Sequence, residues 1–232
     1  MVKINRSFFQ SKVCRFMSSQ NDRIVVLISG SGSNLQALID TIHQNPQKVG
    51  HIVAVISNNA DALGLQRAEQ VGIETRVLSH QGFREREAYD TALLELIEYY
   101  QPKLIVLAGF MRILSAFFVA HFQGRLLNIH PSLLPKHKGL HTHKRALEAG
   151  DAEHGASVHF VSADLDGGPV IAQSHCQISP EDDELSLAQR VQDLEHVLYP
   201  QVVSWFMQDQ LQWFNGSTLR LHGKELAQPL RI

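Results

Sequence analysis

Residues 125–135 read Arg-Leu-Leu-Asn-Ile-His-Pro-Ser-Leu-Leu-Pro, and the rest of the chain is best understood outward from this stretch. Its short apolar run predicts a strand, which Pro131 ends because proline cannot donate to a sheet ladder. Asn128 and His130 are two residues apart, so on a strand they point to the same face. The amide can donate to an oxyanion and the imidazole can carry a proton, at a sheet edge where ligands typically bind. The alternative interpretation is a strand end with two solvated polar residues.

Composition limits the class of protein. The chain has 232 residues, of which 44% are hydrophobic and 19% charged, so we expect one domain with its own core. The net charge is −2 and the pI about 6.7, and no basic surplus indicates nucleic acid or a membrane surface. Cys14 and Cys176 are the only cysteines, which excludes a disulfide framework and favours the cytoplasm. No apolar run approaches the roughly 18–20 residues of a membrane-spanning helix.

The amino-terminal residues differ from the rest. Residues 1–22 carry scattered Lys and Arg, and no acid precedes Asp22. This composition predicts a disordered leader, with an organellar transit peptide as the alternative and Met17 as a second candidate start. We expect a catalytic domain over residues 23–207 and a tail with weak strand signals over residues 208–232.

Strand and helix signals alternate along the chain. Buried β-branched runs followed by 3.6-residue periodicity predict four successive β-then-α units. Such a series is typical of an α/β, doubly wound, mostly parallel sheet of the Rossmann-like kind, in a single domain. The predicted strands before residue 125 are 23–29, 52–56, 73–78 and 104–108, and the helices are 35–42, 63–71, 83–100 and a fourth that Ser115 can cap and that reaches about His121. After residue 135 we predict strands at 155–162 and 169–178 and a helix at 184–207. The acids at 182–184 suit the start of that helix, and Pro200 should kink or split it.

A glycine-rich turn, Gly30 to Asn34, joins the first strand to the first helix. Free backbone N–H groups at a helix start favour an anion such as phosphate. The dinucleotide fingerprint is not met, because Leu35 stands where its third glycine belongs, and no Gly-Lys-Ser/Thr of a P-loop is present. The alternative is a tight turn with no ligand.

Asp166 lies in the turn-rich loop Asp166-Gly167-Gly168-Pro169 and is a candidate partner for His130. A carboxylate beside an imidazole raises its pKa and orients the ring, although spacing alone favours an ordinary turn aspartate. His141 and His143 have ligand-like spacing, but the Cys or carboxylate pattern of a zinc site is missing, so we expect no metal.

Four segments, in this order, resemble one known family. They are Ile28-Ser-Gly-Ser-Gly-Ser-Asn-Leu-Gln36, Val106-Leu-Ala-Gly-Phe-Met-Arg-Ile-Leu114, Asn128-Ile-His-Pro-Ser-Leu-Leu-Pro135 and Leu165-Asp-Gly-Gly-Pro169. Together they are similar to the folate-dependent formyltransferases, and within them to the phosphoribosylglycinamide formyltransferases of purine synthesis. The resemblance covers about residues 23–207, and the joint occurrence is specific although no single segment is.

The resemblance implies a reaction. The amine of glycinamide ribonucleotide would attack the formyl carbon of 10-formyltetrahydrofolate, and Asn128 and protonated His130 would hold the tetrahedral oxyanion. Asp166 would keep that histidine protonated and assist proton transfer to the leaving folate nitrogen. Neither a covalent enzyme intermediate nor a metal is implied.

The resemblance also implies binding residues. The ribonucleotide would contact Gly32, Ser33, Asn34 and Glu195. The folate would contact Arg86, Met111, Arg112, Ile113, Leu114 and Asn128. His137-Lys138 stands where an aromatic-Pro pair is expected in some relatives, a departure that concerns only the shape of that loop.

Three other functions are compatible with some of the same sequence features. A methionyl-tRNA formyltransferase is expected to add a carboxyl-terminal nucleic-acid-binding domain, and a formyltetrahydrofolate deformylase an amino-terminal regulatory domain. A non-catalytic nucleotide-binding module is expected to lack one of Asn128, His130 and Asp166, and all three are present. We therefore expect a cytoplasmic enzyme of small-molecule substrates, monomeric or homodimeric, that binds neither nucleic acid nor membrane.

Overall fold

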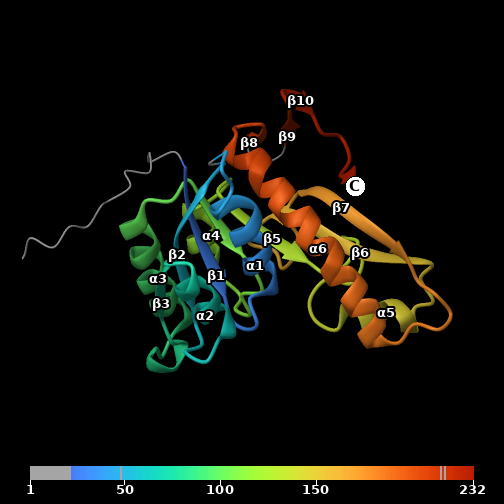
Figure 1. Cartoon of the computed structure of the whole chain (residues 1–232), viewed down its shortest axis with the longest axis horizontal. Coiled ribbons are helices and arrows are strands. Elements are labelled where there is room, and N and C mark those ends of the chain that lie inside the picture. The colour runs from blue at the N-terminus through green and yellow to red at the C-terminus, as the bar shows by residue number, and fades with distance from the viewer. Residues whose placement is uncertain (1–21, 48, 215, 217) are drawn as a thin grey trace, which may run out of the picture.

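The computed structural model describes residues 22–47, 49–214, 216 and 218–232. The predicted leader therefore lies outside the described residues, apart from Asp22. Eight of the eleven strands among the described residues form one sheet, in the order β11-β7-β6-β5-β4-β1-β2-β3 (Figure 1). Five neighbouring strands, from β3 to β5, are parallel, which confirms the prediction of a mostly parallel α/β sheet.

The parallel strands are short, and in all of them except the edge strand β3 the side chains are mostly buried on both faces, as continuous apolar runs predict. Their bounds are β1 (Arg23–Ile28), β2 (His51–Ser57), β3 (Glu74–Val77), β4 (Leu104–Leu107) and β5 (Leu126–His130). The connecting segments are α1 (Ser33–Leu38), which continues as the π-helix η2 (Ile39–His43), then α2 (Leu63–Gln70), the 3-10 helix η3 (His80–Gly82), α3 (Arg86–Tyr100) and α4 (Ala116–His121).

The second half of the sheet changes direction. The remaining elements of this half are α5 (Thr142–Glu148), β6 (Glu153–Phe160), β7 (Val170–Gln177) and α6 (Glu184–Met207). β6 is antiparallel to both β5 and β7, so the last predicted strands form a hairpin rather than another crossover. The sheet has a hydrophobic core on each face: α1, α2 and α6 cover one face, while α3 and α4 cover the other (Figure 1).

The last 25 residues form β8 (Leu211–Phe214), β9 (Thr218–Leu221), β10 (Lys224–Glu225) and β11 (Leu230–Arg231). The first three make a small antiparallel sheet, and β11 pairs with β7 at the edge of the large one. β8 and β9 lie within the tail over which weak strand signals are predicted. The division of the chain at residue 207 stays a prediction.

Three local expectations need correction. The helix predicted from residue 83 begins at Arg86, because 80–82 form the separate turn η3. Pro200 does not split α6, which runs unbroken over Glu184–Met207 from a capping box between Asp183 and Ser186. Ser115 occupies the position before α4, but its side chain makes no capping bond there; its backbone N–H instead donates to Asp90 Oδ2 at 2.6 Å.

Candidate active site

Three neighbouring strands end at the same edge of the sheet. The glycine-rich turn follows β1, the segment from Gly109 follows β4, and β5 ends at His130. Because parallel strands present their carboxyl ends together, residues distant in sequence meet here. Two hollows mark this edge: a cleft of about 110 Å³ beside β4 and β5, and a pocket of about 180 Å³ over the glycine-rich turn.

The structure brings Asn128, His130 and Asp166 together. His130 Nδ1 lies 3.5 Å from Asp166 Oδ2, and these two side chains are only 8% and 9% exposed. Asp166 has a φ of +46°, a left-handed conformation that Asp tolerates better than most residues, and its Oδ2 accepts the Gly139 N–H at 2.9 Å. The loop between β6 and β7 thereby aims the carboxylate across 36 residues of sequence at the imidazole.

His159 belongs to this group, and the sequence analysis missed it. In the β5–β6 register it stands directly opposite Asn128, and its Nε2 lies 3.0 Å from Asn128 Nδ2. Its Nδ1 lies 2.9 Å from the Phe160 carbonyl oxygen, which only accepts, so Nδ1 carries the proton and Nε2 accepts from the amide. Burial lowers the pKa of His159 to about 4, which keeps it neutral in that role. Only the register of an antiparallel pair could have revealed it.

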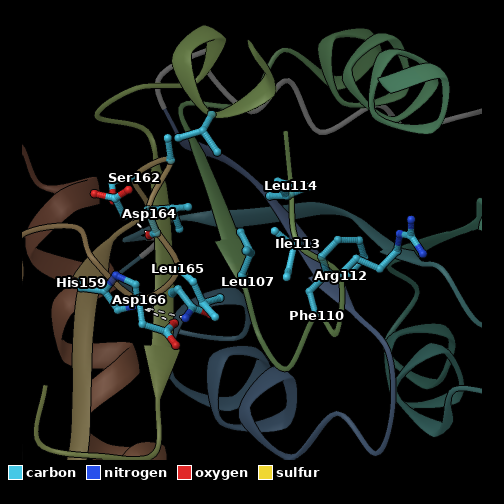
Figure 2. A pocket seen from close by; sticks show the side chains of 14 residues that line it. Leu107, Phe110, Arg112, Ile113, Leu114, His159, Ser162, Asp164, Leu165 and Asp166 are labelled. Atoms are coloured by element: carbon cyan, nitrogen blue, oxygen red, sulfur yellow. Dashed lines mark hydrogen bonds and ion pairs between the residues drawn. The ribbon is translucent and has the colours of Figure 1, made fainter. Parts of the chain in front are cut away.

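The cleft joins polar and apolar walls (Figure 2). Four of the predicted folate contacts line it: Arg112, Ile113, Leu114 and Asn128. The other wall is the loop carrying Asp166, with Leu165, and the floor includes Leu107 and His159 (Figure 2). The cleft therefore combines an apolar lining with the amide and the carboxylate of the predicted catalytic group.

Two predicted folate residues lie elsewhere. Met111 lines the pocket over the glycine-rich turn, is 70% exposed, and is tied there by its N–H to Ser29 Oγ at 2.8 Å. Arg86 begins α3, its side chain is half exposed, and it is not among the residues that line the cleft. Arg112, by contrast, holds its guanidinium over the Tyr89 ring at 4.6 Å.

The predicted phosphate residues Gly32, Ser33 and Asn34 line the second pocket. Gly32 has a φ of +71°, and a Cβ there would lie 2.6 Å from the Cα of Gly64. Only glycine fits this turn, because both the conformation and the space exclude a side chain. Arg67 braces the outside of the turn by donating from Nε to the Ser31 carbonyl at 2.9 Å.

Side chains of helix α6 hydrogen-bond two of the residues that line this pocket. Asn34 Nδ2 donates to Glu195 Oε2 at 2.8 Å, and Gln192 Nε2 donates to Ser33 Oγ at 3.1 Å. Burial raises the pKa of Glu195 to about 7, against the lowering effect of the Asn34 hydrogen bond. Gln192 was missed, although its place three residues before Glu195 puts both on one helix face.

The histidines weighed as metal ligands make other contacts. His143 Nδ1 lies 3.2 Å from His154 Nε2, and His137 Nε2 lies 2.7 Å from Asp151 Oδ2. In the part of the chain that the structure describes, no group of three or more His, Cys, Asp or Glu side chains is arranged to hold a metal ion. Nor does any described helix have the length and apolarity needed to cross a membrane.

Residues 22–203 match the Formyl transferase family, and the chain belongs to that family. It is 55% identical over 206 residues to phosphoribosylglycinamide formyltransferase of Escherichia coli (strain K12), covering 86% of this chain and 97% of that protein. It is also 50% identical over 191 residues to the trifunctional purine biosynthetic protein adenosine-3 of Drosophila melanogaster, covering 82% of this chain and 14% of that protein.

A solved phosphoribosylglycinamide formyltransferase from Coxiella burnetii superposes with a TM-score of 0.86 at 51% identity, covering 90% of this chain and 98% of that one. Glycinamide ribonucleotide transformylase 1 from Symbiobacterium toebii gives a TM-score of 0.82 at 38% identity, covering 88% and 95%. The resemblance drawn from the four sequence segments is thereby confirmed.

Proposed function

We propose that this chain transfers the formyl group of 10-formyltetrahydrofolate to the amine of glycinamide ribonucleotide, a step of de novo purine biosynthesis. The observation that carries the proposal is the convergence of Asn128, His130 and Asp166 beside the cleft of a formyl transferase. The enzymes that match nearly their whole length to this chain have the same activity in their names. Cytoplasmic location and a monomeric or homodimeric state are part of the proposal.

The proposed chemistry is direct attack. The amine lone pair forms a C–N bond to the formyl carbon, and the carbonyl electrons move to oxygen. Asn128 and protonated His130 donate to that oxyanion, whose stabilisation is typically a large contribution to acyl-transfer rates. The intermediate collapses by breaking the bond to the folate nitrogen, which gains a proton while the amine loses one. Asp166, next to His130 Nδ1, stabilises the imidazolium and assists this transfer.

His159 supports the amide in this scheme. Since its Nε2 accepts one hydrogen of Asn128 Nδ2, the orientation of the amide is fixed with N–H groups rather than the carbonyl oxygen on that side. The second hydrogen of Nδ2 remains for the developing oxyanion. A histidine kept neutral by burial is required, because an imidazolium would present a donor to the amide instead.

The two hollows divide the substrates. The cleft, with Arg112, Ile113, Leu114 and Asn128, takes the folate, and Arg86 and Met111 are assigned to its periphery. Apolar side chains suit the pterin, and a cation suits the folate carboxylates. The pocket with Gly32, Ser33 and Asn34 takes the phosphate, with Glu195 on the remainder of the ribonucleotide.

The proposal is tested with purified wild type and a His130→Ala variant, supplied with 10-formyltetrahydrofolate with and without glycinamide ribonucleotide. We expect turnover that requires the ribonucleotide and falls by about 10²–10⁴ in the variant, as for loss of a general acid. His121→Ala is the matched control, because that histidine is half exposed and pairs with Glu98 on the surface. Folate cleavage without the ribonucleotide would indicate a deformylase, and no turnover in folded wild type would indicate a binding module.

A further inference from the structure

The loop from Ser132 to Gly139 lies against the predicted catalytic histidine. His130 Nε2 is 3.0 Å from the backbone carbonyl oxygen of His137. A carbonyl oxygen only accepts, so Nε2 of His130 must carry a proton to make this bond. Nδ1, which faces Asp166, is then the nitrogen left to gain or lose a proton, and when protonated it is the nitrogen that donates to the oxyanion of the proposed reaction. The position of one loop carbonyl therefore determines which nitrogen of His130 is available for chemistry.

That carbonyl belongs to a residue in an unfavourable backbone conformation. His137 has a φ of +53°, and residues with a Cβ rarely adopt this left-handed region. Its side chain compensates, because His137 Nε2 lies 2.7 Å from Asp151 Oδ2, and the two side chains are only 12% and 13% exposed. The hydrogen bond from His137, followed by that from Lys136, holds the pKa of Asp151 below its ordinary value. The carboxylate is thus anionic and fixed between α5 and β6.

Other contacts anchor the loop on both sides of His137. Ser132 Oγ donates to the Lys136 carbonyl at 2.7 Å, and Arg145 donates to the Lys138 carbonyl at 2.6 Å. The His154 ring packs edge-on against the His137 ring with 6.1 Å between centroids, and burial lowers the pKa of His154 to about 4, so it stays neutral beside the ion pair. His137, the residue with the left-handed φ between these anchors, is the residue whose carbonyl contacts His130.

We infer that the His137–Asp151 hydrogen bond positions the catalytic imidazole: it holds the His137 carbonyl against His130 Nε2 and so fixes the tautomer that turns Nδ1 toward Asp166. The inference rests on the proposed function and adds two positioning residues to it. It also gives a role to the place where this chain has His137-Lys138 instead of an aromatic-Pro pair. Neither His137 nor Asp151 needs to touch a substrate.

Two substitutions of His137 distinguish the effect of its contact with Asp151 from the effect of its backbone conformation. Asparagine tolerates left-handed φ better than histidine but is too short to reach Asp151, so His137→Asn removes the pair without adding strain. Glutamine places an amide nitrogen as many bonds from Cβ as His Nε2, so His137→Gln keeps a donor for Asp151. Lys136→Met is the matched control: it removes the 63% exposed partner of the same carboxylate and should change kcat by less than about twofold.

The measurements are kcat, both KM values, and the tautomer of His130 from long-range ¹H–¹⁵N correlation at a pH where the imidazole is neutral. The His130 signals are assigned by their loss in His130→Ala. We expect the Nε2–H tautomer in wild type. In His137→Asn we expect a shift toward Nδ1–H with about a tenfold fall in kcat, as for loss of one positioning hydrogen bond, and KM values within about twofold. His137→Gln should restore both readouts.

An Nδ1–H tautomer in wild type would overturn the inference. So would a fall in kcat in His137→Asn with the tautomer unchanged, since that result is what a merely structural residue gives. If His137→Asn does not fold, Asp151→Ala, which removes the acceptor of the His137 Nε2–H, replaces it with the same expected shift. Absence of formyl transfer in wild type would refute the proposed function alone, because the tautomer measurement needs no substrate.

Discussion

Two buried carboxylates at the same edge of the sheet have opposite surroundings. Asp166 accepts the Gly139 N–H and faces His130 Nδ1 at 3.5 Å, while His159 Nε2, which accepts from Asn128, lies 3.7 Å away. Glu195 projects from α6 and, within the described residues, has one hydrogen bond, from Asn34. Burial consequently raises the pKa of Glu195 to about 7. Asp166 already has its partners inside the protein, whereas Glu195 lacks enough of them to be ionised without cost.

These two environments suit two different roles for the carboxylates in the proposed reaction. A carboxylate that orients an imidazole must be positioned before any substrate arrives, and its donors are supplied by the fold. A carboxylate that binds a substrate is completed by donors that the substrate brings. Asn34 supports the same interpretation, because its Oδ1 is buried and no described residue donates to it.

Asp166→Asn should have the largest effect. The amide keeps the shape and an acceptor for the Gly139 N–H, but it cannot stabilise an imidazolium at His130. We expect kcat to fall by about 10³, within the range for general acid–base catalysis, with KM for the ribonucleotide nearly unchanged. Steady-state kinetics at saturating folate measures both values.

Asp193→Asn is the matched control, because Asp193 is an exposed aspartate on α6 whose carboxylate contacts only surface Gln189 among the described side chains. Its kinetics should equal those of wild type. A loss confined to KM in Asp166→Asn would place Asp166 with Glu195 as a substrate-binding carboxylate and remove the distinction.

The sequence predicted the parts of this edge that depend on local patterns. Buried apolar runs indicated β1, β4 and β5, and the acids before residue 184 indicated the start of α6, which the Asp183 capping box confirms. Asn128 and His130 could be placed on one strand face from their spacing alone. These features need only the period of a strand or the chemistry of a helix start.

Other parts depend on tertiary pairing and could not be predicted. His159 meets Asn128 only because β6 pairs antiparallel to β5 in one register. Asp151 meets His137 because a turn after α5 returns beneath the loop, and no spacing indicates this. β11 is two residues long and forms only where β7 offers an unpaired edge. The assignment of Met111 to the folate rather than to the second pocket stays a prediction of the resemblance.

The second prediction concerns stability, and it contrasts His159 with Glu195. The pKa of His159 is about 4 in the folded protein and 6.5 ordinarily, so between these values the unfolded chain binds more protons. Stability is therefore lost as pH falls from 6.5 toward 4, by a contribution of the order of 3 kcal/mol at 1.36 kcal/mol per pKa unit. His159→Gln should flatten this part of the curve, measured as the free energy of urea unfolding at several pH values. An unchanged slope would mean that His159 is not the group that must be neutral.

The third prediction has the opposite sign. The pKa of Glu195 is raised from 4.5 to about 7, so the folded protein binds more protons in that window and stability falls as pH rises through it. Glu195→Gln should remove this cost and make the protein more stable than wild type at pH 8, by about 2 kcal/mol after allowing for an unpartnered amide group. At pH 4 the advantage should vanish. A stabilisation that persists at pH 4 would show that charge is not its cause.

The same variant gives the fourth and smallest prediction, which asks what Glu195 binds. If the ribonucleotide donates a hydrogen bond to the Glu195 carboxylate, Glu195→Gln should raise KM for the ribonucleotide about tenfold, as for loss of a hydrogen bond to a charged group. KM for the folate should be unchanged. Ribose 5-phosphate separates the two groups that Glu195 can meet, because it carries the sugar hydroxyls and the phosphate but no amine. If the carboxylate contacts the ribose, the inhibition constant of ribose 5-phosphate should be larger in Glu195→Gln than in wild type. The increase should be greatest above pH 7, where the wild-type carboxylate is ionised. An inhibition constant unchanged by the substitution, alongside a raised KM, would assign Glu195 to the amine. No change in either quantity would mean that Glu195 only holds Asn34, and the two carboxylates would then both be completed by the protein itself.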